Sequence, residues 1–167
     1  MRKACLFFIL AAFLLAPLAA TAQVLEKGRL RDVLPDDGLD KSSVVVLRDQ
    51  AALNAHYYLA DETVLGLSKK TEALFARYRT GPGVALLLVV AYPSDEEARR
   101  VYERFGRDFF LKTFDGKSPR TLEKLETGDY AAAVLARSVL IVVLEAPNRK
   151  SCDELARRAE ERALALF

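Results

Sequence analysis

The chain has 167 residues, with 25 lysines and arginines against 23 aspartates and glutamates, and 51% of its residues are hydrophobic. This near-neutral balance gives no long-range attraction for nucleic acid or anionic lipid, so we expect no nucleic-acid partner. The length fits one domain that is large enough to bury a substantial core.

The first 22 residues have the pattern of a signal peptide. Arg2 and Lys3 provide the positive start, an apolar stretch runs over 4–16, and Ala20-Thr21-Ala22 supplies small residues for a signal peptidase. We therefore expect export to the periplasm or the extracellular space, with cleavage after Ala22.

A retained membrane anchor is the alternative interpretation of the leader. Residues 4–22 are mostly apolar and approach the roughly 20 residues that a spanning helix needs. Pro17 and the small-residue end favour cleavage, after which we expect no stable membrane insertion. An acylated lipoprotein is disfavoured, because Cys5 lies at the start of the apolar stretch and not at the cleavage site.

Cleavage changes the charge and the cysteine content of the chain. Removing Arg2 and Lys3 leaves 25 − 2 = 23 basic residues against 23 acidic ones, a net charge of zero. Removing Cys5 leaves Cys152 as the single cysteine, so no intrachain disulfide can form and a disulfide would require a second chain.

The mature chain divides into two parts by its patterning. Residues 23–42 form a polar N-terminal arm with a turn at Pro35-Asp36-Asp37-Gly38. Residues 43–167 are expected to form a single α+β domain with repeat-like halves at about 72–110 and 128–167.

The predicted elements follow from hydrophobic periodicity and turn residues. They are a strand at 43–48, a helix capped by Asp49 that runs to about Ala60, strands at 72–80 and 84–92 joined at Gly81-Pro82-Gly83, a helix from Ser94, strands at 130–136 and 139–145, and a final helix from Ser151. Ser94-Asp95-Glu96-Glu97 and Ser151-Cys152-Asp153-Glu154 both have the pattern of a capping box.

Both long helices are expected to be amphipathic. The apolar positions are Ala98, Val101, Tyr102, Phe105 and Phe109 in the first, and Leu155, Ala156, Ala159, Ala163 and Leu166 in the second. Acid–base pairs four residues apart, such as Glu154 with Arg158, are expected on the solvent side.

The second half repeats the order of the first. Each half has a strand, a turn, an apolar strand, a proline, a Ser-x-x-Glu box and an amphipathic helix. We therefore predict a duplicated strand-strand-helix unit, which would form an antiparallel sheet with both helices on one face.

The segment from Ala73 to Ala163 resembles a family of uncharacterised bacterial exported envelope proteins of unknown function. The resemblance rests on VALLLVVAYPSDEEARRVYERF, on the Gly-Asp-Tyr turn and on AAVLARSVLIVVLEAP. It implies an envelope location and assigns no activity, cofactor or site residue.

Few residues are candidates for chemistry. His56 could act as a general base only with a partner acid such as Asp61 or Glu62. Cys152 lies at the start of a predicted helix, where free amide groups would lower the pKa of its thiol. No group of residues has the spacing of metal ligands, and we expect no metal or other cofactor.

Three aromatic residues, Phe109, Phe110 and Phe114, are candidates for a contact surface beside the loop that runs to Pro119. The sequence thus predicts a non-catalytic module that binds an unknown envelope protein or a small ligand through its sheet or this loop. The alternative is a small periplasmic hydrolase that uses His56 with nearby acids.

The leader gives the first prediction. The intact mass of the protein from the envelope fraction should correspond to a chain that starts at Gln23, because the small-residue end favours cleavage after Ala22. A protein that retains Met1 in the membrane pellet would show instead that the leader is an anchor.

Overall fold

The computed structural model describes residues 29–59, 64–81, 83–110 and 114–167. The predicted signal peptide lies outside these residues. Within them, none of the helices has the length and apolar character that a bilayer span requires.

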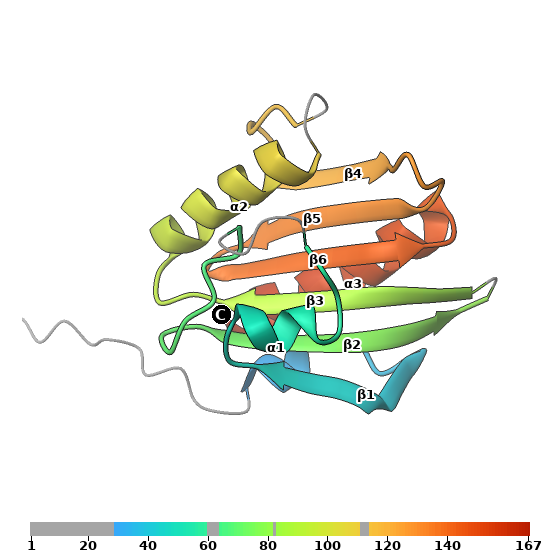
Figure 1. Cartoon of the computed structure of the whole chain (residues 1–167), viewed down its shortest axis with the longest axis horizontal. Helices are drawn as coiled ribbons and strands as arrows, with labels where there is room; N and C mark the ends of the chain where they lie inside the picture. Colours follow the sequence, from blue (N-terminus) through green and yellow to red (C-terminus); the bar gives the residue numbers. More distant parts are fainter. Residues whose placement is uncertain (1–28, 60–63, 82, 111–113) are drawn as a thin grey trace, which may run out of the picture.

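The described strands form one six-stranded sheet in the order β1-β2-β3-β6-β5-β4, with every neighbouring pair antiparallel (Figure 1). The strands are β1 (Leu39–Leu47), β2 (Glu72–Thr80), β3 (Gly83–Ala91), β4 (Arg120–Lys124), β5 (Tyr130–Ala136) and β6 (Val139–Ala146). The helical elements are the 3₁₀ helix η1 (Arg29–Val33), α1 (Gln50–Asn54), α2 (Asp95–Phe109) and α3 (Arg149–Leu166). This architecture confirms the prediction of an α+β fold with an antiparallel sheet.

The N-terminal part differs most from the predictions. β1 begins at Leu39, before the expected start at Ser43, and η1 buries Leu30 and Val33 in the core. The arm is therefore packed against the domain from Arg29 onward. Asp49 caps α1 as predicted, but the helix ends at Asn54, well before Ala60.

β4 was not predicted from the sequence. Its residues, RTLEK, are mostly polar and pair with β5 at the edge of the sheet. Four of its five residues are partly buried and none is fully buried, so the strand lacks the apolar alternation that identifies a half-buried strand.

The two long helices lie on opposite faces of the sheet, which corrects the prediction that both lie on one face. α2 packs on one face, where Phe105 shares a buried cluster with Leu88 and Val142. α3 packs on the other, where Leu155 shares a second cluster with the neighbouring strand residues Val89 and Val143. Figure 1 shows α2 in front of the sheet and α3 behind it.

A β-bulge lies near the end of β6, just before the chain passes to the face on which α3 packs. The pairing with β5 shifts between Ala132↔Val143 and Tyr130↔Ala146, so β6 contains one extra residue there. Glu145 adopts a positive φ of 53° within this bulge. Val143 and Ala146 consequently belong to the same cluster although they are three positions apart. The bulge reverses the alternation of faces just before the chain enters α3.

The internal duplication is not shown by the structure. A two-fold rotation about an axis normal to the sheet would relate the antiparallel strands β3 and β6, and it would leave both helices on the same face. Since α2 and α3 lie on opposite faces, this rotation does not superpose the two strand-strand-helix units. The duplication stays a prediction from the order of elements.

The helix starts are set by two different cap residues. Ser94 caps α2 as predicted, and its side chain accepts a hydrogen bond from the amide of Glu97 at 3.2 Å. The cap of α3 is Asn148, whose side chain accepts from the amide of Ser151 at 2.9 Å. Ser151 lies within the first turn, so the prediction that it caps the helix is wrong. Asparagine caps helices as well as serine does, and here it comes first along the chain.

The caps give the second prediction. Ser94→Ala and Asn148→Ala should each lower the free energy of unfolding by about 0.5 to 2 kcal/mol, because each leaves an amide at a helix start without its partner. Ser151→Ala is the matched control for Asn148→Ala and should change the free energy of unfolding by less than about 0.5 kcal/mol. Denaturant midpoints measure all three. A larger loss for Ser151→Ala than for Asn148→Ala would contradict the cap assignment.

Candidate functional site

His56 is the candidate general base of the alternative hydrolase interpretation. His56 is exposed just after α1, and its ring stacks on Phe75 with a centroid separation of 6.1 Å. Its expected partners, Asp61 and Glu62, lie outside the described residues. No hydrogen bond of the His56 side chain is found within the described part of the chain, so nothing there favours a role as a general base.

Cys152 is fully buried at the start of α3, in the cluster beneath that helix. Burial raises the pKa of its thiol to about 12, and the neighbouring carboxylate of Asp153 adds to the increase. The expected lowering by the helix start is therefore outweighed, because desolvation disfavours the thiolate. The thiol packs as a small apolar group in the core.

The three phenylalanines at the end of α2 pack mainly on one another and on the helix. Phe110 is buried, whereas Phe109 and Phe114 are partly buried. The rings of Phe105 and Phe109 stack at 5.0 Å, and Phe114 contacts Tyr102 edge-on at 5.4 Å. A side chain at Gly106 would collide with the Phe114 ring. A contact surface at Phe109, Phe110 and Phe114 stays a prediction.

Metal ligation finds no support in the described residues. They contain no group of three or more histidine, cysteine, aspartate or glutamate side chains that could hold an ion. Among the described residues, the cavities are the next candidates for function.

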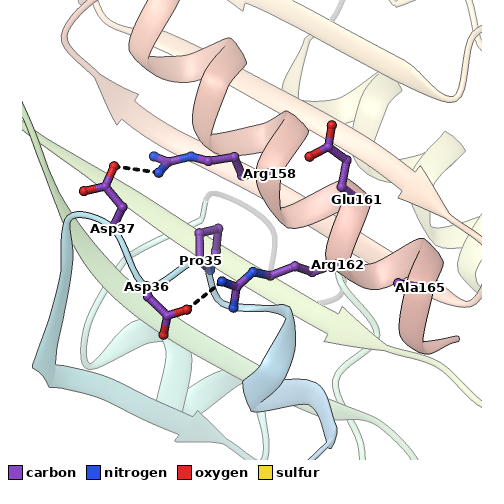
Figure 2. A pocket seen from close by; sticks show the side chains of 7 residues that line it. All are labelled: Pro35, Asp36, Asp37, Arg158, Glu161, Arg162 and Ala165. Carbon is purple, nitrogen blue, oxygen red and sulfur yellow. Dashed lines mark hydrogen bonds and ion pairs between the residues drawn. The ribbon is translucent and has the colours of Figure 1, made fainter.

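The first cavity, here called the arm cavity, has a volume of about 480 Å³ and lies between the Pro35-Asp36-Asp37 turn and α3 (Figure 2). Arg158 bonds to Asp37 at 2.8 Å and Arg162 to Asp36 at 2.6 Å. The sequence pattern had predicted Glu154 as the partner of Arg158. Arg162 also donates to the carbonyl of Leu34 at 2.8 Å.

These ion pairs attach the arm to α3. The hydrogen bond from Arg162 holds the pKa of Asp36 below its usual value, so the pair is intact at neutral pH and is lost as the pH falls through that lowered pKa. The carboxylates are exposed, and exposed pairs contribute little to stability. Because Arg158 and Arg162 already bind the arm, we interpret the contacts that line the arm cavity as structural.

A buried tyrosine makes the stronger attachment of the arm. The hydroxyl of Tyr78 donates to the carbonyl of Pro35 at 2.9 Å, and the side chain is 1% exposed. Gly38 follows with a φ of 80°, and its carbonyl accepts from the amide of Arg79 at 2.7 Å. Burial raises the pKa of Tyr78 well above its usual value, so the hydroxyl remains a donor throughout the ordinary pH range.

The second cavity, here called the strand-end cavity, has a volume of about 600 Å³ and lies where β1 ends and β2 begins. Its floor is apolar: Leu30 and Leu74 belong to the cluster beneath α3, and Val46 pairs with Leu74 on the same face of the sheet. The apolar lining also includes Leu47 and Ala73, whose side chains point to the opposite face, into the cluster beneath α2. All of these are 6% exposed or less except Val46, which is 61% exposed.

The rim of the strand-end cavity is charged. Arg31, Arg48 and Lys69 line it together with a single carboxylate, Glu72. All three cations are exposed, and none of the described residues forms an ion pair with them. Sequence reasoning missed this site because its residues come from three separate segments and no local pattern unites them.

Comparison with known proteins finds no family model that matches the chain and no match among curated proteins. The resemblance to exported envelope proteins therefore stays a prediction.

Tyr78 gives the third prediction. Tyr78→Phe should lower the free energy of unfolding by about 0.5 to 1.5 kcal/mol, because the buried carbonyl of Pro35 loses its donor. The control is Tyr58→Phe, which removes a hydroxyl from a side chain that is 71% exposed and should have no measurable effect. Urea unfolding of both variants provides the comparison. Equal stability of Tyr78→Phe and the unmodified protein would show that this bond does not hold the arm.

Proposed function

We propose that this protein is a non-catalytic binding domain of the bacterial cell envelope that holds a small ligand in the strand-end cavity. The observation that carries the proposal is the cavity itself, whose volume of about 600 Å³ lies within the range of small-molecule sites. An apolar floor with a few polar groups at one side is typical of such sites.

The envelope location is supported by the sequence of residues 1–22. The positive start, the apolar stretch and the Ala-x-Ala end are the features of an export signal. A cleaved domain of zero net charge would have no strong electrostatic attraction to the membrane surface. A small diffusible ligand is therefore the simplest occupant for the cavity.

Binding has more support than catalysis. The strand-end cavity contains no histidine or cysteine among its described lining residues. His56 and Cys152, the candidate reactive groups, belong to an exposed loop and to the buried core. No contact among the described residues supports the hydrolase alternative.

The fourth prediction tests binding at the cavity with N-phenyl-1-naphthylamine, a neutral apolar dye. Fluorescence titration of the mature protein should show saturable binding. Val46→Asp should weaken it about tenfold, because a charge would then face the apolar floor. Val46 is 61% exposed, so the substitution should leave the fold intact.

Val84→Asp is the matched control for this experiment. Val84 is another exposed strand valine, 50% exposed, and it pairs with Arg79 at the end of β2 remote from the cavity. This variant should bind the dye as the unmodified protein does. Absence of saturable binding, or equal loss in both variants, would refute the proposal.

A further inference from the structure

We propose that the ligand of the strand-end cavity is an amphiphilic anion, with its apolar chain on the floor and its anionic head at the cationic rim. This inference rests on the proposed function and adds the chemical class of the ligand. It follows from the separation of apolar and cationic groups within one cavity.

The rim has an excess of positive charge. Three cations against the single carboxylate of Glu72 leave a local charge of +2 from the groups that line the cavity. Arg31, Arg48 and Lys69 have no ion-pair partner in the described parts of the chain, so their charges are available to an incoming anion. Arg99 and Arg100 on α2 likewise form no ion pair with any described residue, so the rim is distinguished by the gathering of three cations at one cavity.

The segment that carries Lys69 is held in place by local hydrogen bonds. The hydroxyl of Thr71 donates to the carbonyl of Ser68 at 2.9 Å and accepts from the amide of Ser68 at 2.9 Å. The side chain of Ser68 accepts from the amide of Lys70 at 3.2 Å. The backbone at Lys69 is therefore fixed beside the cavity before any ligand binds, which lowers the entropic cost of binding.

The floor accounts for the apolar part of the ligand. β1 is the edge strand of the described sheet, and Val46 on it is largely exposed although its partner Leu74 on β2 is buried. An alkyl chain placed there would remove Val46 from water. The described lining residues include no aromatic side chain, so the cavity has no ring on which a nucleobase could stack.

Calorimetry with dodecanoate, dodecan-1-ol and acetate tests the ligand class. Dodecanoate should bind with one-to-one stoichiometry, dodecan-1-ol about fivefold or more weakly, and acetate undetectably, because binding requires both the chain and the charge. Dodecanoate affinity should fall as the salt concentration rises.

A double variant separates the rim from the floor. The double substitution Arg48→Gln and Lys69→Gln should weaken the binding of dodecanoate about fivefold or more and leave the affinity for dodecan-1-ol unchanged. The control is Arg99→Gln with Arg100→Gln, which removes the same charge from exposed positions on α2 and should change neither affinity. The protein should not co-sediment with phosphatidylglycerol vesicles, because the cavity takes a single molecule.

The outcomes distinguish the two proposals. Equal binding of dodecanoate and dodecan-1-ol, with no effect of the double variant, would overturn the anionic class and leave a binding cavity. No binding of either compound or of the neutral dye would overturn both proposals. Vesicle sedimentation that the double variant abolishes would identify a membrane surface as the partner and refute the single-molecule site.

Discussion

Burial of both faces of the central strands β3 and β6 is the constraint on which the structure depends. Both strands are apolar at almost every position, so a sheet covered on one face only would expose half of these side chains to water. The chain meets this requirement with α2 and the segment around α1 on one face, and with α3 and η1 on the other.

Buried tyrosine hydroxyls hold the segments without regular secondary structure against the sheet. Tyr78 donates a hydrogen bond to the carbonyl of Pro35, and Tyr92 donates one to the carbonyl of Leu65 at 2.8 Å.

The strand-end cavity follows from where this cover ends. η1 buries Leu30 against the sheet but does not extend over Val46 on the edge strand β1. The apolar surface therefore continues from the packed core to the exposed Val46, where it forms the floor of the open strand-end cavity. Cationic residues from three segments border it. Arg158 and Arg162 of α3, in contrast, bind carboxylates of the arm. The proposed ligand class depends on this gathering of cations beside the exposed Val46.

Local pattern predicted the elements of the central sheet well and their arrangement less well. The strands over 72–80 and 130–136 match the observed bounds, because alternating or continuous apolar residues reflect burial directly. The bulge just before α3, in which Glu145 leaves the regular pairing with β5, could not be read from the sequence, because no glycine marks the residue that adopts a positive φ. The continuous apolar sequences of β3 and β6 did indicate that both faces of these strands are buried. The cavity was beyond prediction, since it requires residues near 30, 47 and 70 to meet.

The most direct test of the account is a methyl and aromatic NOESY spectrum of the mature protein, because it reports which helix lies against which face of β6. The account predicts contacts from the α2 ring of Phe105 to the face that contains Val142, and from the α3 methyl groups of Leu155 to the face that contains Val143. Contacts from both helices to the same set of β6 side chains would contradict the two-face arrangement, and with it the role of the bulge at Glu145.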